Sequence, residues 1–196
     1  MTSNALRSWE GERRARLNEL YIAHTTVGGS GPGRRTATEQ LNWSLAIRLA
    51  GEFQGFARDL HDEALDALLD HVGTPTPAAQ RIIRNQFTLN RQLDKGNATP
   101  SALQQDFLRL GFKLLDDLKS SYRRAESWLK ALENLNDARN GIAHSDSSKI
   151  AKATGTGRLQ LQQVKGWDAS MRMTARAIDV VTSRNIATIT AGGPPW

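Results

Sequence analysis

The fold is decided by residues 41–72, LNWSLAIRLAGEFQGFARDLHDEALDALLDHV, in which apolar residues recur every three or four positions. This spacing puts one apolar stripe on a single side of a helix: Leu41, Leu45, Leu49, Phe53, Phe56, Leu60, Ala64, Leu68 and Val72. Thr36 or Thr38 can cap the start of that helix, and the Thr-Pro-Thr-Pro stretch at 74–77 ends it. We therefore expect a long helix over about 36–72, buried along one face.

Helical spacing continues on both sides of this segment. Further helices are expected over 4–26, 78–94, 101–110, 112–120, 124–145 and 165–188. Glycine- or proline-containing breaks separate them at 28–33, 95–100 and 154–157. Short connections favour antiparallel neighbours, so we predict an all-α fold: an antiparallel helical bundle with a long second helix. One domain over 1–190 and a flexible C-terminal tail over 191–196 complete this interpretation.

Composition excludes several classes of protein. The 196 residues include no cysteine, which excludes disulfides, thiolate zinc sites and cysteine nucleophiles. The start resembles no signal peptide, and no apolar run approaches the roughly 18 residues that span a membrane, so we expect a cytoplasmic protein. The net charge of +6 suits a nucleic-acid partner, although positive charge for solubility accounts for it equally well.

One short segment carries residues suited to RNA cleavage. Asn140 and His144 are four positions apart, so they share a helix face, and the long side chain of Arg139 can turn to the same side. A histidine can take the proton of a ribose 2′-hydroxyl, and an arginine can hold the phosphate oxygens. The same residues also fit a helix C-terminus that merely favours cations.

Small residues accompany these polar ones. Gly141 costs about 1 kcal/mol in a helix relative to alanine, and Ala143 is small as well. Both suggest that another backbone passes close by, and a second copy of the same helix is the simplest candidate. We therefore place Gly141 and Ala143 in a predicted homodimer interface.

The segment 137–145, DARNGIAHS, resembles the Arg–polar–His motif of the HEPN superfamily. The stretch 49–60, LAGEFQGFARDL, is similar to the long second helix of the RiboL-PSP-HEPN subgroup, and the likeness extends over about 36–185. The resemblance implies an all-helical dimeric bundle. It also implies a metal-independent endoribonuclease that needs no cofactor and acts in toxin–antitoxin or antiviral systems. RNA, a second copy, and an antitoxin or regulatory protein are then the expected partners.

The resemblance and the chemistry together assign three roles. His144 is the general base or acid, Arg139 the phosphate clamp and Asn140 the orienting amide. Glu52 is a supporting candidate: if it points inward it needs a partner, for which we consider Arg139, and otherwise it is an exposed residue. RNA-binding candidates, unless they form only a solvated face, are Arg81, Arg84, Arg91, Arg123 and Arg124.

Two other functions remain open at this point. A HEPN module without catalysis would bind RNA or a partner protein, and a purely structural or regulatory bundle would bind no nucleic acid.

The adjacent residues His61, Asp62 and Glu63 make a poor metal site, because neighbours on a helix do not face one another. We therefore predict no metal site.

Overall fold

The computed structural model describes residues 1–28, 35–73 and 76–196, and within these ranges the chain is helical and contains no strand. The first helical segment consists of α1 (Asn4–Ser8), a π-helical turn η1 (Trp9–Arg13) and α2 (Arg14–Gly28). The elements that follow are α3 (Arg35–Val72), α4 (Pro77–Thr88), α5 (Gln92–Lys95), α6 (Pro100–Leu108), α7 (Leu114–Ser121), α8 (Ala125–Ala143), α9 (Ser147–Thr154) and α10 (Leu161–Thr190). The predicted all-α fold is confirmed.

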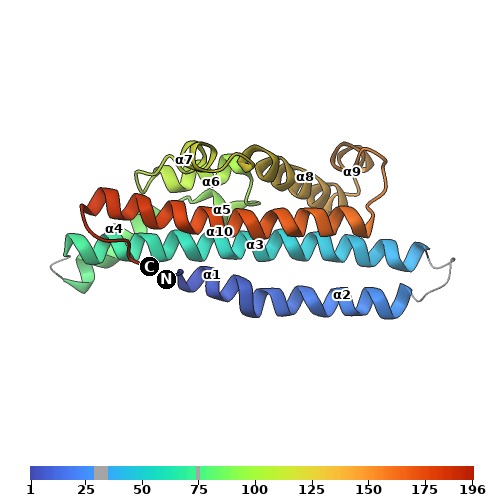
Figure 1. Cartoon of the computed structure of the whole chain (residues 1–196), viewed down its shortest axis with the longest axis horizontal. Coiled ribbons are helices and arrows are strands. Elements are labelled where there is room, and N and C mark those ends of the chain that lie inside the picture. Colours follow the sequence, from blue (N-terminus) through green and yellow to red (C-terminus); the bar gives the residue numbers. More distant parts are fainter. Residues whose placement is uncertain (29–34, 74–75) are drawn as a thin grey trace.

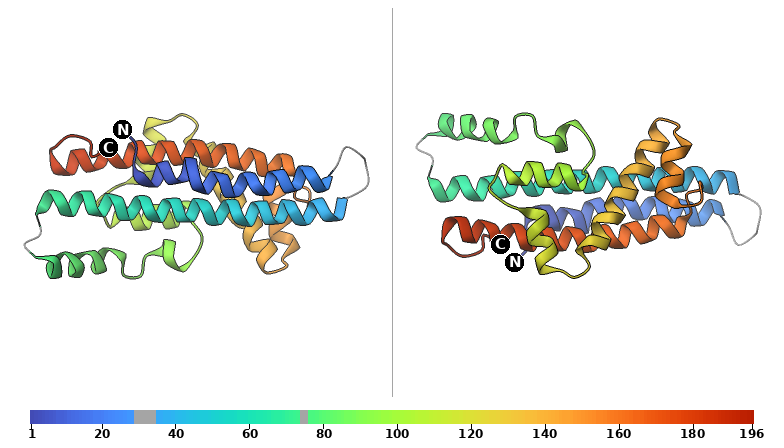
Figure 2. Two further views of the ribbon diagram at one scale, coloured as in Figure 1. Left: turned by 90° about the horizontal axis from the view of Figure 1, so that it is seen from below. Right: turned by 90° about the horizontal axis from the view of Figure 1, so that it is seen from above.

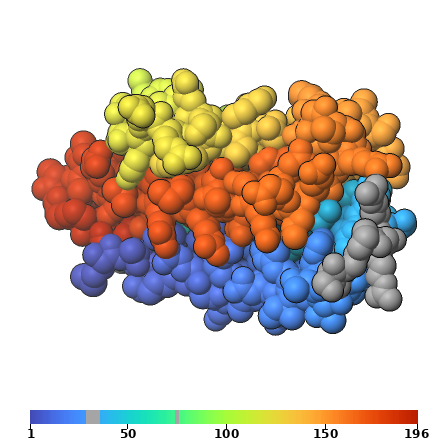
Figure 3. Space-filling view, turned by 45° about the vertical axis from the view of Figure 1, so that its right-hand side comes forward, coloured from blue at the N-terminus to red at the C-terminus, as the bar shows by residue number. Residues whose placement is uncertain are grey.

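The helices form three layers. Figure 1 shows α3 and α10 running side by side in the same direction, with α1 and α2 on one side of them and the segment from α5 to α9 on the other. Both α2 and α8 run opposite to this central pair, so most neighbours are antiparallel, as expected. In the space-filling view of Figure 3, α10 separates the blue N-terminal segment from the yellow and orange surface of α7 to α9.

The predicted stripe of α3 builds the centre of the core. Leu45, Leu49, Phe53, Phe56 and Leu60 are each at most 1% exposed. The rings of Phe53 and Phe56 lie 5.8 and 5.7 Å from the ring of Trp9, which joins α3 to the N-terminal segment. The stripe differs at its end, where Leu65 and Leu69 are buried and Val72 is 74% exposed.

The structure differs from the predicted elements after residue 88 and after residue 143. The helix expected over 78–94 ends at Thr88, because Asn90 adopts a left-handed conformation with φ of 60°. An unpredicted helix, α9, follows α8; its N-terminus is capped by the side chain of Asp146. The loop expected over 28–33 lies outside the described residues, apart from Gly28.

The tail expected to be flexible is attached at its end. Trp196 packs against the hydrophobic core, and its carbonyl oxygen accepts a 2.9 Å hydrogen bond from the Ser183 hydroxyl. The two ends of the chain therefore lie close together, as Figure 1 shows. No helix among the described residues is long and apolar enough to pass through a membrane.

Candidate active site at the end of helix α8

The end of α8 is closed by a tight turn that leads directly into α9. The backbone N–H of Asp146 donates to the carbonyl of Gly141 at 2.7 Å, and the N–H of Ser145 donates to that of Ile142 at 3.4 Å. Ser145 has a φ of 54°, so this pair of bonds is a Schellman motif with serine in the left-handed position. The motif fixes His144 at the corner between two helices.

Position 141 requires glycine because other residues of the same chain pack closely against it. A Cβ atom at this position would lie 2.8 Å from Cγ1 of Ile150 and 2.9 Å from the backbone oxygen of Asp146. The close backbone expected here is thus that of α9 and not that of a second copy. The structure thus explains the glycine without a second copy, and the dimer-interface role of Gly141 stays a prediction. Ala143, by contrast, is exposed.

Asn140 is held between two hydrogen-bond donors. Its side-chain oxygen accepts bonds from Nη1 of Arg139 at 3.1 Å and from Nδ2 of Asn97 at 2.8 Å. A guanidinium only donates, so the atom of Asn140 that faces it must be the oxygen. Asn140 is therefore placed to orient Arg139, and its role in catalysis stays a prediction.

Asn97 belongs to the segment between α5 and α6, which was interpreted only as a helix stop. The segment is fastened to α8 a second time, because Nδ2 of Asn136 donates to the carbonyl of Ala98 at 3.1 Å. Ala98 is 1% exposed, so the backbone beside Asn97 is anchored in the core. Asn97 is thus a residue of the candidate site that no local pattern in the sequence could have indicated.

His144 is exposed and makes no side-chain hydrogen bond or ion pair with the described residues, while Arg139 and Asn140 are half-buried. The hydrogen bond to Asn140 turns the Arg139 guanidinium toward the face on which His144 lies one helical turn further on. A fixed cation and an accessible imidazole thus border one side of α8. Four hollows in the described part of the molecule are lined by residues outside this motif.

Glu52 is buried, as one of the two interpretations expected, but its partners are different from the predicted one. Its carboxylate contacts Arg13 at 2.9 Å, Arg16 at 2.7 Å and Arg48 at 2.9 Å, and it does not pair with Arg139. Burial opposes ionisation of Glu52, but hydrogen bonds from Arg16 and Arg13 outweigh it and lower the pKa. Glu52 joins α3 to the N-terminal segment and lies outside the candidate active site.

Arg91 is not available to RNA. It is 5% exposed and bonded to Asp62 at 2.5 Å and to Asp94 at 3.0 Å. It also donates to Nδ1 of His61 at 3.2 Å, and Nε2 of this fully buried histidine donates to the carbonyl of Asp106 at 3.1 Å. A guanidinium cannot accept a hydrogen bond, so His61 is the neutral tautomer protonated at Nε2. This cluster is structural.

The other four arginines do not surround the motif. Arg84 is paired with Asp66, and Arg81 is exposed on α4. Figures 1 and 2 place α4 at the end of the bundle away from α9. Arg123 and Arg124 are exposed at the start of α8, and fifteen helical residues place Arg124 roughly 22 Å from Arg139. The predicted basic surface around the motif is therefore not formed by these residues.

The described residues contain no group of three or more histidine, aspartate or glutamate side chains that could hold a metal ion. Comparisons of the chain with models of protein families, with curated proteins and with solved structures found no match. The resemblance to HEPN proteins therefore stays a prediction that rests on the residues quoted for it.

Proposed function

We propose that this protein is a HEPN-type endoribonuclease that cleaves RNA without a metal ion through Arg139, Asn140 and His144. The observation that carries the proposal is the hydrogen bond between Arg139 and Asn140, one helical turn from the exposed imidazole of His144. Asn97 supports it, because it fixes the amide that orients the guanidinium. A cation is thus oriented before substrate binds.

The proposed reaction uses the nucleophile that RNA carries. His144 removes the proton of a ribose 2′-hydroxyl, and the 2′-oxygen attacks the adjacent phosphorus. Arg139 bonds the non-bridging oxygens and stabilises the charge that gathers there. The bond from phosphorus to the 5′-oxygen breaks, and this oxygen takes a proton from water or from the imidazolium of a second copy. The products carry a 2′,3′-cyclic phosphate and a 5′-hydroxyl.

Dimer formation belongs to the proposal, because Ala143 and His144 are both exposed at the corner between α8 and α9. A second copy packed on this corner would exclude water and strengthen the electrostatic contacts to the phosphate. The role in growth arrest or phage defence that the resemblance implies would then follow from cleavage of cellular or phage RNA.

The test is a cleavage assay on single-stranded and structured RNA with a chelator present. His144→Ala and Arg139→Ala are expected to lower the rate by about a hundredfold or more, since each removes a group that acts in the transition state. His71→Ala and Arg7→Ala are matched controls, because both residues are exposed and lie outside the motif. Wild-type cleavage that His144→Ala leaves unchanged would refute the proposal.

A second candidate is an RNA-binding HEPN module without catalysis, for which the exposure of His144 without a side-chain partner among the described residues is sufficient. Such a module would shift RNA in a gel in a salt-dependent manner and cut it neither with chelator nor with divalent metals. A salt-dependent gel shift without any cleavage would favour this binding module over the proposed nuclease.

A further inference from the structure

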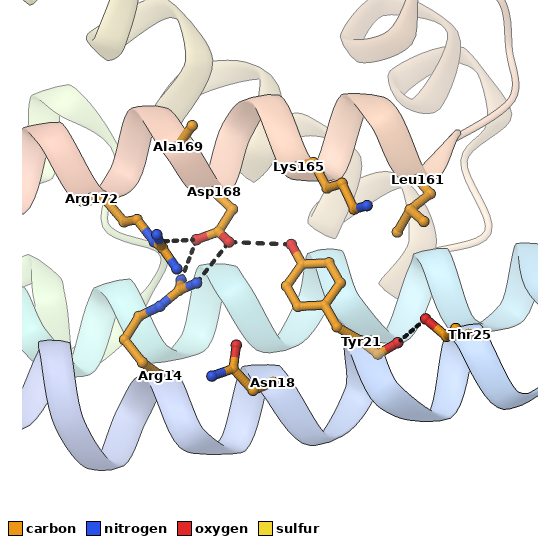
Figure 4. Close-up of a pocket in the computed structure, with 9 residues that line it drawn as sticks. All are labelled: Arg14, Asn18, Tyr21, Thr25, Leu161, Lys165, Asp168, Ala169 and Arg172. Carbon is orange, nitrogen blue, oxygen red and sulfur yellow. Dashed lines mark hydrogen bonds and ion pairs between the residues drawn. The ribbon is translucent and has the colours of Figure 1, made fainter.

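A separate hollow of about 280 Å³ lies between α2 and α10. Figure 4 shows side chains reaching it from both helices: Arg14, Asn18 and Tyr21 from α2, and Lys165, Asp168 and Arg172 from α10. Neither Arg139 nor His144 lines this hollow, so it does not belong to the candidate active site.

Among the described residues that line the hollow, Asp168 has the only carboxylate, and its oxygens are engaged in hydrogen bonds. Asp168 forms a bidentate ion pair with Arg14, and both residues are buried. The hydroxyl of Tyr21 also donates to Asp168, at 3.3 Å. Burial and the adjacent Asp168 charge raise the pKa of Tyr21, so the phenol stays neutral and keeps donating at physiological pH. Asp168 is thus neutralised by Arg14.

Two further cations lie on the same face of α10, and neither makes a hydrogen bond to Asp168. Lys165 and Arg172 lie three residues before and four residues after Asp168, and both are exposed. Lys165 makes no hydrogen bond or ion pair with the described residues, and Nε of Arg172 is 3.9 Å from Asp168, beyond hydrogen-bond distance. Three cations against one carboxylate leave the hollow with two unneutralised positive charges.

We propose that this hollow binds a small phosphate monoester, with its phosphate held by Lys165 and Arg172. The volume lies just below the range of about 300–1,000 Å³ that is usual for small-molecule sites, which favours a small ligand. A monoester above its second pKa of about 6 carries nearly two negative charges, which match the net positive charge that Arg14, Lys165 and Arg172 leave beside Asp168. A phosphodiester carries only one negative charge, and the chain of a nucleic acid would have to extend out of the hollow on both sides of the phosphate.

Room for the rest of the ligand lies next to the hollow. A second hollow of about 270 Å³ shares Arg14, Asn18 and Arg172 with the first. Its other charged residues, Glu10 and Arg176, form an ion pair at 2.6 Å and so add no net charge. The amide of Asn18, exposed at the shared edge, can bond a polar substituent of the ligand.

The test is a titration of the full chain with methyl phosphate and with dimethyl phosphate, followed by amide NMR shifts. Methyl phosphate is expected to move signals of residues 14–25 and 161–172 and dimethyl phosphate to bind at least about tenfold more weakly, because it lacks the second charge. Binding of methyl phosphate should weaken from about pH 8 to about pH 5 as the ligand gains a proton, whereas sulfate binding should stay constant.

Two double variants distinguish binding of methyl phosphate at this site from non-specific attraction to a positively charged protein. Lys165→Ala with Arg172→Ala should weaken methyl phosphate binding at least about tenfold. Lys119→Ala with Arg123→Ala removes the same charge from exposed positions elsewhere and should have no such effect. Three results would each overturn the proposal. They are an equal loss of binding in both double variants, no change of NMR shifts with methyl phosphate, and tighter binding of a short RNA that moves the same NMR signals.

Discussion

Asn97 donates a hydrogen bond of 2.8 Å to Asn140, although 43 positions separate the two residues in sequence. The oxygen of Asn140 is thereby shared between Asn97 and Arg139, while its Nδ2 group has no partner among the described residues. Asn140 can thus orient the guanidinium and still offer a donor to a substrate.

Asn97→Ala tests this relationship. Loss of the bond frees the amide of Asn140 and costs about 1 kcal/mol of stability. If the proposed function holds, kcat for RNA cleavage should fall about tenfold while KM changes little, because the residue acts on orientation and not on binding. Steady-state kinetics measure both constants. Asn85→Ala, at an exposed position of α4, is the control, and an unchanged kcat in Asn97→Ala would contradict the role.

Gly141→Ala tests the contact between α8 and α9. The added Cβ would lie 2.9 Å from the oxygen of Asp146, a backbone atom that cannot turn aside, so we expect a loss of about 1–3 kcal/mol. Gly166→Ala in α10 is the matched substitution, because its Cβ would meet nothing within 4 Å. That change should stabilise the protein by about 0.5–1 kcal/mol. Urea denaturation measures both, and equal effects would show that α9 does not pack as described.

Glu52→Gln tests whether Glu52 is structural. The hydrogen bonds from Arg13 and Arg16 and the ion pair with Arg48 are weakened, so the free energy of unfolding should fall by about 1.5–3 kcal/mol at neutral pH. The folded-state pKa of Glu52 is lowered, so its contribution is present at neutral pH and is lost as the pH falls through that pKa. The difference from wild type should therefore shrink in acid.

Activity provides the second arm of the Glu52→Gln experiment. Cleavage per folded molecule should match the wild type, since Glu52 does not contact Arg139. Impaired cleavage by a fully folded Glu52→Gln protein would restore the role first predicted for this residue.

Asp179→Asn should show the opposite dependence on pH. Asp179 is 1% exposed and bonded to the hydroxyl of Ser3, and its burial raises the pKa of the carboxyl. A raised folded-state pKa means that the contribution of Asp179 to stability is present at low pH and is lost as the pH rises. The stability of Asp179→Asn relative to wild type should thus increase from acid to neutral pH. Thermal unfolding across this range measures it, and a constant or decreasing difference would contradict the assignment.

The sequence predicts those parts of the fold that depend on spacing within one helix. The stripe of α3 and the position of Arg139, Asn140 and His144 near the end of α8 follow from local periodicity. The short helix α9 escaped prediction because eight residues give too few turns for a periodic pattern, although Asp146 and Gly155 mark its ends.

Contacts between distant segments could not be predicted in this way. The turn η1 breaks the regular helical register, and adjacent arginines pair with different helices: Arg13 with Glu52 of α3, and Arg14 with Asp168 of α10. Arg91 does not share a helix with the RNA-binding candidates Arg81 and Arg84, because α4 ends at Thr88 and the chain turns at Asn90 before it reaches Arg91. The partners of Glu52 and Asn140 likewise depend on the packing of separate helices.

The chemistry at the ends of the cleaved RNA tests the central claim most directly. Mass spectrometry of RNA incubated with the wild-type protein and a chelator should find 2′,3′-cyclic phosphate and 5′-hydroxyl ends. These should be absent with His144→Ala or when the ribose at the cut carries no 2′-hydroxyl. Products with 3′-hydroxyl and 5′-phosphate ends, or cleavage that survives both changes, would contradict a reaction in which His144 activates the 2′-hydroxyl beside Arg139.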